Sequence, residues 1–168
     1  MSTAQHYEFE IDKANNTIYI VREFDGSLEI VWDSWTKPEY LDLWWGPKTW
    51  HAETIEMDFR DGGYWFYAMV SPENQRHYGK TNFIAVEPQK YFASKGGFAD
   101  DKGIINTQMP QNVWENTFTA VDSKTRIQMR LIYDTFDDLE AELAMGFKEG
   151  ISLCMEQLDE ILEQNRIK

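Results

Sequence analysis

The feature that most constrains the fold is a change of hydrophobic period late in the chain. Beyond Asp137 and Asp138, apolar residues recur every three or four positions, which is typical of one face of an α-helix. These residues are Leu143, Phe147, Ile151, Cys154, Leu158 and Ile161. The pattern predicts a long C-terminal helix, and in a single-domain protein its one apolar stripe must cover a sheet.

The segment from Trp50 to Tyr133 alternates instead with a period of two, which is typical of half-buried strands. The expected strands cover residues 50–60, 64–70, 78–86, 90–95, 112–121 and 125–133. Turn residues separate these runs, so we expect an antiparallel meander. The stretch from Gly96 to Pro110 has little pattern, and we expect it to be a mobile loop that covers an opening.

The N-terminal part predicts two further strands and two short helices. Gln5 to Asp12 reads as an edge strand and Thr17 to Asp25 as a stronger strand. Ser27 is a candidate N-cap for the first helix, and Pro38 begins the second. The expected fold class is α+β, with a curved antiparallel sheet of about six to seven strands around the C-terminal helix. We expect one domain over residues 1–168, with 1–16 as an N-terminal extension or edge strand.

Charge and composition argue against several kinds of partner. The chain carries 16 basic and 29 acidic side chains, a formal charge of -13, which repels nucleic acids and anionic membrane surfaces. No apolar run approaches the roughly 20 residues that cross a bilayer, and the chain opens without a secretory signal, so we expect a cytoplasmic protein. One cysteine and three scattered histidines predict no disulfide and no metal site. We expect no cofactor either.

Aromatic residues make up 15% of the chain and include seven tryptophans. Such rings either fill an oversized core or line a concavity for an apolar ligand. In the turn formed by residues 44–47, one tryptophan ring can close the core while the other caps the mouth of the sheet, or both can form the wall of a ligand entrance. Downstream, Trp65, Tyr67 and Met69 share one face of a strand whose two faces are both apolar.

Three segments resemble a known family. They read VREFDGSLEIVWDSWTKPEYLDLWWGP, MDFRDGGYWFYAM and GFKEGISLCMEQLDEIL. Over roughly Thr17 to Gln164 the chain is similar to the family of the C-terminal domain of the activator of the Hsp90 ATPase, within the START-like helix-grip superfamily. The resemblance implies a helix-grip fold with an internal cavity. Such relatives range from a co-chaperone domain to stand-alone bacterial proteins and to cavity-bearing proteins that bind lipids or aromatic polyketides.

Arg22 is the most informative charged position, because it lies on the apolar face of its strand and needs an anionic partner there. Nearby candidates in strand positions are Asp58, Arg60 and Glu115. Arg22 either braces the sheet through a structural ion pair or anchors an amphipathic ligand at the base of the cavity. The candidate ligand-binding residues are Arg22, Trp44, Trp45, Trp65, Tyr67, Met69, Glu115, Met129, Phe147 and Ile151.

Three further positions of the C-terminal helix need an explanation. Gly146 and Gly150 each cost about 1 kcal/mol relative to alanine within a helix. We expect close packing against the sheet to compensate, with extra room for a ligand as the alternative. Cys154 lies on the apolar stripe and is expected to be a small core residue whose thiol pKa is raised by burial.

The sequence favours the binding of a small hydrophobic or aromatic molecule in an internal cavity. One alternative is a protein-interaction module that binds Hsp90 or another protein. Only about 16 residues precede the region of resemblance, so we expect no separate N-terminal domain like that of the full activator. A second alternative is a cavity enzyme of cyclase or hydrolase type, although no catalytic motif is recognisable. The chain is expected to be a monomer or a homodimer.

Overall fold

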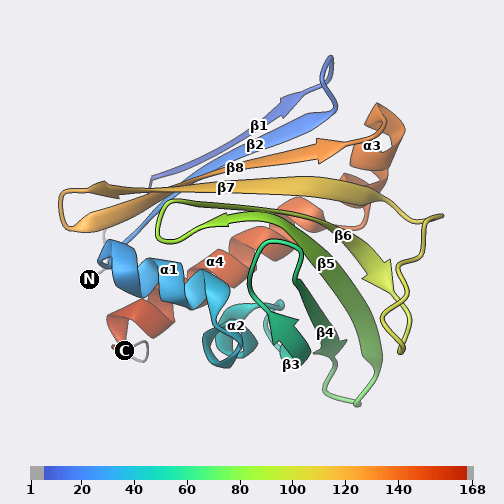
Figure 1. Ribbon diagram of the computed structural model, residues 1–168, viewed down its shortest axis with the longest axis horizontal. Helices are drawn as coiled ribbons and strands as arrows, with labels where there is room; N and C mark the ends of the chain where they lie inside the picture. The colour runs from blue at the N-terminus through green and yellow to red at the C-terminus, as the bar shows by residue number, and fades with distance from the viewer. Residues whose placement is uncertain (1–5, 166–168) are drawn as a thin grey trace.

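The molecule is organised around one bent sheet and the helix that covers its concave side (Figure 1). A computed structural model describes residues 6–165. The strands are β1 (Tyr7–Asp12), β2 (Thr17–Phe24), β3 (His51–Asp58), β4 (Tyr64–Val70), β5 (Arg76–Glu87), β6 (Tyr91–Ala99), β7 (Gln111–Val121) and β8 (Lys124–Tyr133). The helices are α1 (Leu28–Thr36), α2 (Pro38–Trp44), α3 (Phe136–Ala144) and α4 (Phe147–Glu163).

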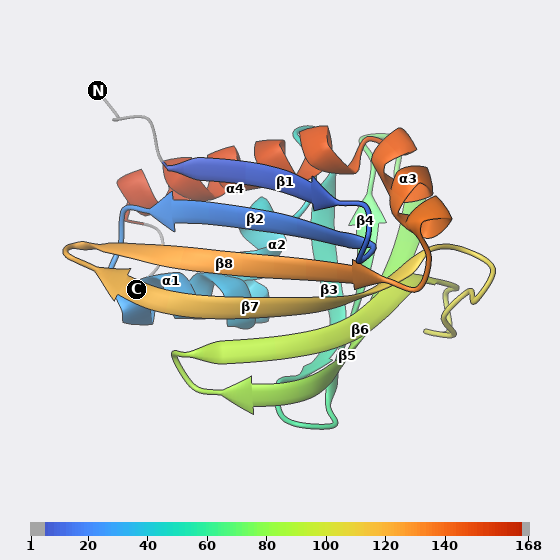
Figure 2. The same ribbon diagram turned by 90° about the horizontal axis from the view of Figure 1, so that it is seen from above.

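The sheet is antiparallel and has eight strands in the order β1-β2-β8-β7-β6-β5-β4-β3. Figure 2 shows that β3 and β4 run at a steep angle to β1 and β2, because the sheet bends strongly between its two edges. The expected fold class is confirmed. The sheet has one strand more than the upper expected number, since the whole of β1 pairs with β2.

Local signals explain where the two short helices begin. The side chain of Ser27 accepts a hydrogen bond from the backbone N–H of Ile30 at 3.3 Å, which caps α1 as predicted. Pro38 occupies the first turn of α2, where its missing N–H costs nothing. Both helices lie on the same side of β7 and β8 as α4 (Figure 1). There they bury Trp35 and Trp44 in the core.

The C-terminal segment forms two helices, not the single long helix that the periodicity predicted. Gly146 separates them with φ +91°, a left-handed conformation that glycine adopts without strain. The expected close packing is wrong, because a Cβ at Gly146 or Gly150 would meet nothing within 4 Å among the described residues. The left-handed backbone conformation therefore explains why residue 146 is glycine. No contact explains why residue 150 is glycine.

The stretch from Gly96 to Pro110 is only partly a loop. Gly96 and Gly97 belong to β6, which extends to Ala99, so the predicted end of this strand was too early. A Cβ at Gly96 would lie 2.3 Å from the carbonyl oxygen of Lys80, and glycine thus permits close approach of β5 and β6. Within the remaining loop, the Asp100 carboxylate accepts hydrogen bonds from two backbone N–H groups.

Candidate functional site

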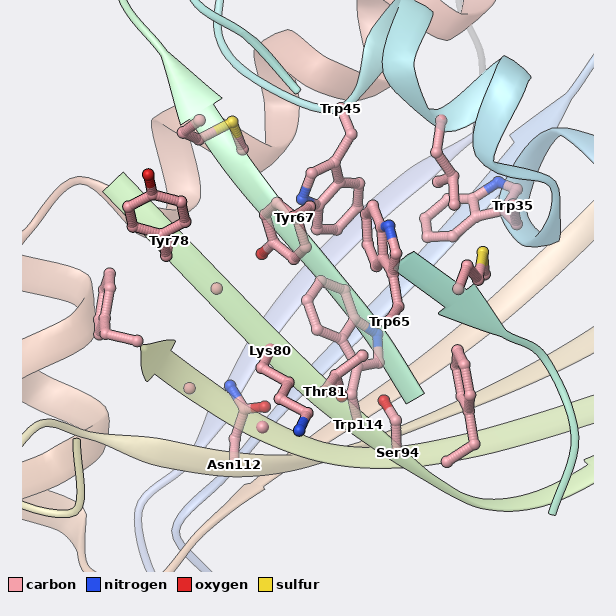
Figure 3. A pocket seen from close by; sticks show the side chains of 18 of the residues that line it. Trp35, Trp45, Trp65, Tyr67, Tyr78, Lys80, Thr81, Ser94, Asn112 and Trp114 are labelled. Atoms are coloured by element: carbon pink, nitrogen blue, oxygen red, sulfur yellow. The ribbon is translucent and has the colours of Figure 1, made fainter. Parts of the chain in front are cut away.

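A cavity of about 240 Å³ lies on the concave side of the sheet (Figure 3). Its lining comes from α1, α2 and the turn that follows, from β3 to β7, and from α3. The lining residues are Trp35, Leu41, Trp45, Met57, Trp65, Tyr67, Met69, His77, Tyr78, Gly79, Lys80, Thr81, Phe83, Phe92, Ser94, Gly96, Gly97, Phe98, Asn112, Trp114, Asn116 and Glu142. The volume exceeds the roughly 150 Å³ at which an apolar protein cavity already accepts benzene.

Aromatic rings form much of the cavity wall. The ring centroids of Trp65 and Tyr67 are 4.1 Å apart in a stacked arrangement. Trp45 contacts both Trp65 and Trp114, with centroids at 5.7 and 5.8 Å. Burial raises the pKa of Tyr67, and a hydrogen bond with Trp45 opposes this effect in part. The result is a wall of large flat apolar surfaces, which suits a planar ligand.

The position of Tyr67 depends on a glycine in the neighbouring strand. Tyr67 on β4 pairs with Gly79 on β5. A Cβ at Gly79 would lie 2.7 Å from both Cζ and the hydroxyl oxygen of Tyr67. The ring therefore lies over the backbone of residue 79, and this arrangement would be blocked by any larger side chain there.

The turn after α2 divides its two tryptophans between the core and the cavity. Trp44 is 1% exposed, and its indole N–H donates to the carbonyl oxygen of Ser34 at 2.9 Å. Trp45 lines the cavity. The two roles left open for the pair are thus split, with one ring closing the core and the other forming part of the cavity wall.

Helix α4 holds this turn in place through two side chains. The backbone N–H of Gly46 donates to Sγ of Cys154 at 3.2 Å, and Gln157 donates to the carbonyl oxygens of Trp44 and Gly46 at 3.1 and 2.6 Å. Burial raises the pKa of the Cys154 thiol to about 11, so it is protonated at neutral pH. Cys154 is buried in the core as predicted, but its contact with Gly46 has no signal in the sequence.

Three buried polar atoms on the cavity-lining residues have no hydrogen-bond partner within the described part of the chain. They are Nε1 of Trp35, Nε1 of Trp114 and Oδ1 of Asn116. Asn116 is 2% exposed, and its Nδ2 donates to the carbonyl oxygen of Phe92 at 3.5 Å. Buried polar groups normally find partners, so these atoms are available to a bound molecule or to water.

A carboxyl group from α3 also lines the cavity. Nδ2 of Asn112 donates to Glu142 at 3.2 Å and lies 3.3 Å from the hydroxyl oxygen of Tyr133. Burial raises the pKa of Glu142, although hydrogen bonds with Tyr133 and Asn112 oppose this. Glu142 was not predicted as a site residue, because the helical pattern marks only the apolar positions of this segment. The break at Gly146, which gives α3 its own direction, could not be seen in the periodicity.

Arg22 lies outside this cavity. Its guanidinium binds the carboxylate of Asp159 on α4, with Nη1 3.3 Å from Oδ1 and Nη2 in contact with Oδ2. The structural ion pair is thus the role that Arg22 has, but the three proposed partners were wrong. A partner on the helix was missed because Asp159 lies about 137 residues away in sequence.

Glu115 lies on the opposite face of β7 from the cavity-lining Trp114 and Asn116, since side chains alternate along a strand. Its Oε1 is 3.3 Å from Nη1 of Arg130, and its Oε2 accepts a hydrogen bond from the Tyr91 hydroxyl at 3.0 Å. Oε1 has an ion-pair distance to Arg130 without hydrogen-bond geometry. Glu115 therefore belongs to a polar cluster on the outer face.

The other candidate residues fall into two groups. Four of them, Trp45, Trp65, Tyr67 and Met69, line the cavity together. Four others, Trp44, Met129, Phe147 and Ile151, pack in or against the hydrophobic core without lining it. Register could have indicated several missed residues, because Ser94, Trp114 and Asn116 follow the inward alternation of β6 and β7.

Two negative observations apply to residues 6–165. No helix there is long and apolar enough to cross a membrane. No group of three or more His, Cys, Asp and Glu side chains in that range is placed to hold a metal ion.

These features define a helix-grip protein, in which a bent antiparallel sheet packs against a C-terminal helix and, with the shorter helices, encloses an aromatic cavity. The chain belongs to the family described as activator of Hsp90 ATPase homolog 1-like protein, whose match covers residues 25–163. The resemblance found in the sequence is confirmed.

Solved structures support the same assignment. A protein from Mycobacterium smegmatis is 30% identical, with a TM-score of 0.85 over 95% of this chain and 97% of that chain. A protein from Arthrobacter aurescens is 27% identical, with a TM-score of 0.87 over 94% of this chain and 91% of that chain. A Silicibacter pomeroyi protein named AHSA1 shares the fold at 21% identity, with a TM-score of 0.70 over 89% and 99% of the two chains. No curated protein matches the chain.

Proposed function

We propose that this protein binds a small, largely aromatic molecule in the cavity between the sheet and the helices. The observation that carries the proposal is the cavity itself, about 240 Å³ and lined by Trp45, Trp65, Tyr67 and Trp114. Ligand sites are concave, mostly apolar and supplied with a few polar groups, and this cavity has all three properties. A core packed only for stability would leave few voids larger than a water molecule.

The test is a titration of the purified protein with naphthalene and with 2-acetylnaphthalene, followed by calorimetry and by the melting temperature. We expect saturable binding at one site and a Tm that rises with ligand concentration. Thr81→Leu places extra volume on the cavity wall and should weaken binding at least about tenfold, the equivalent of roughly 1.4 kcal/mol.

Thr119→Leu is the matched control, because Thr119 is exposed on the opposite face of β7 from the cavity. This variant should bind both compounds as the unmodified protein does. The absence of saturable binding for either compound, or equal weakening by the two variants, would overturn the proposal.

A second candidate function is suggested by the name of the matched family, which refers to an activator of the Hsp90 ATPase. Such a role would use the outer surface, where the formal charge of -13 favours a basic partner site. Capture of purified Hsp90 on the immobilised protein, together with an assay of its ATPase rate, tests this role. An unchanged rate and no retained Hsp90 would exclude it, whatever the outcome of the ligand titration.

A further inference from the structure

Two residues that line the cavity carry a hydrogen-bond donor and an acceptor without a partner in the described part of the chain. Nε1 of Trp114 and Oδ1 of Asn116 are buried and have no hydrogen-bond partner within residues 6–165. An unsatisfied buried polar group costs more than its hydrogen bond would have contributed. Two such groups on lining residues of one cavity therefore indicate that a bound molecule completes them.

The fold places these two groups side by side. Trp114 and Asn116 are two positions apart on β7, so their side chains point to the same face of the sheet. Across from them on β6, Ser94 pairs with Trp114 and Phe92 pairs with Asn116. Figure 3 shows Ser94 and Trp114 among the side chains that surround the cavity. A polar subsite thus lies within an otherwise aromatic wall.

The charge around the cavity restricts the ligand further. Glu142 supplies a carboxyl group to the lining. Lys80 also lines the cavity, and its ammonium group lies 4.7 Å from the ring centroid of Tyr64. A carboxylate on the ligand beside Glu142 would therefore meet like charge.

We infer that Trp114 and Asn116 form a specificity subsite that selects neutral aromatic molecules with both a hydrogen-bond acceptor and a hydrogen-bond donor. The indole N–H of Trp114 donates to the acceptor, and Oδ1 of Asn116 accepts from the donor. A primary aryl amide has both groups. This inference rests on the proposed function and narrows its ligand class.

Three compounds of similar size test the inference at pH 8. 2-Naphthamide offers both a donor and an acceptor, 2-acetylnaphthalene offers the acceptor alone, and 2-naphthoate is an anion. We expect the amide to bind about five- to tenfold more tightly than the ketone, the effect of one hydrogen bond to an otherwise unsatisfied group. The naphthoate should bind more weakly than either neutral compound.

Variants assign the effect to named atoms. Asn116→Leu removes the acceptor at similar size and should make the affinities for the amide and the ketone equal. Asn82→Leu is the matched control, because Asn82 is exposed and alternates outward from Thr81 on β5, so the preference for the amide should persist. Trp114→Phe keeps a ring but loses the N–H. It should lower the affinity for the amide and for the ketone more than the affinity for naphthalene. It keeps the test decisive if Asn116→Leu fails to fold.

A separate variant tests whether the Glu142 carboxylate disfavours anionic ligands. Glu142→Gln removes the carboxylate and should improve binding of 2-naphthoate more than binding of 2-naphthamide. Equal affinities for the amide and the ketone in the unmodified protein would overturn the inference and leave the proposed function standing, since water alone would then satisfy the two atoms. Failure of all the compounds to bind would overturn the proposed function itself.

Discussion

The guanidinium of Arg22 on β2 binds both carboxylate oxygens of Asp159 on α4, and this pair ties the sheet to the helix that covers it. The Arg22 side chain is 5% exposed and that of Asp159 is 26% exposed. Burial raises the pKa of Asp159, although the hydrogen bond and the charge of Arg22 oppose the change. The pair is therefore a partly desolvated bond between two layers of the fold.

Breaking this pair should destabilise the protein without changing the cavity. Arg22→Met leaves Asp159 without its partner and should cost about 3 kcal/mol in the free energy of unfolding, the lower end for a buried pair because Asp159 keeps some contact with water. Urea denaturation at pH 7 measures the loss. Arg126→Met, which breaks a more exposed pair with Glu23, should cost no more than about 1 kcal/mol. Loss of affinity for naphthalene in a folded Arg22→Met variant would contradict this assignment.

Glu142 should make the stability depend on pH. Its folded pKa is raised by burial above the unfolded value near 4.5, so folding favours the protonated form. This contribution is present below that unfolded value and is lost as the pH rises through the folded pKa. Glu142→Gln should therefore raise Tm at pH 8, by about 2–4 °C if the gain is about 1 kcal/mol, and the difference should shrink towards pH 4.

The control for this comparison is Glu140→Gln, because Glu140 is exposed on the same helix. Its Tm should follow that of the unmodified protein at every pH. A Glu142→Gln variant that is less stable at pH 8 than at pH 4, relative to the unmodified protein, would show that the ionised carboxylate is stabilising.

The two glycines near the start of α4 should respond in opposite ways to alanine. Gly146→Ala places a Cβ at φ +91° and should cost about 1–2 kcal/mol through backbone strain alone. Gly150 lies within the helix with open space around its Cβ position, so Gly150→Ala should stabilise the protein by about 0.5–1 kcal/mol. Thermal unfolding of the two single variants measures both effects, and equal shifts of the same sign would refute the assignment.

The thiol of Cys154 should be unreactive towards thiol reagents in the folded protein. Cys154 is 6% exposed and the pKa of its thiol is raised to about 11, so an aromatic disulfide reagent should react slowly at pH 8 and fast after unfolding in urea. Cys154→Ala removes the acceptor for the Gly46 N–H and should cost about 1–3 kcal/mol. Rapid modification under native conditions would show that the turn after α2 opens readily.

Much of the fold could be predicted from the sequence because its signals are local and periodic. Alternation located β3 to β8, while the N-cap at Ser27 located α1 and the proline in its first turn located α2. The predictions failed where one backbone conformation decides the outcome. Gly146 interrupts a helical pattern that is otherwise continuous, and Gly96 and Gly97 continue a strand although glycine usually weakens one.

The candidate site was predicted only in part, for a different physical reason. Trp45, Trp65, Tyr67 and Met69 were found because aromatic and apolar side chains on one strand face or at a helix end are visible in the sequence. The partner of Arg22 was not, because a contact between distant segments depends on the curvature of the sheet and on the rotation of the helix. The place of Glu142 in the cavity wall also depends on how its helix is oriented against the sheet, so it was not predicted.

The bonds from Cys154 and Gln157 to the turn at Gly46 give α4 a second task beside covering the sheet. Trp45 is the residue before Gly46, so the location of its indole follows the axial and rotational setting of the helix. Substitutions on α4 that do not line the cavity can therefore change its shape, and variation among homologues at these two helix positions should accompany changes in that shape.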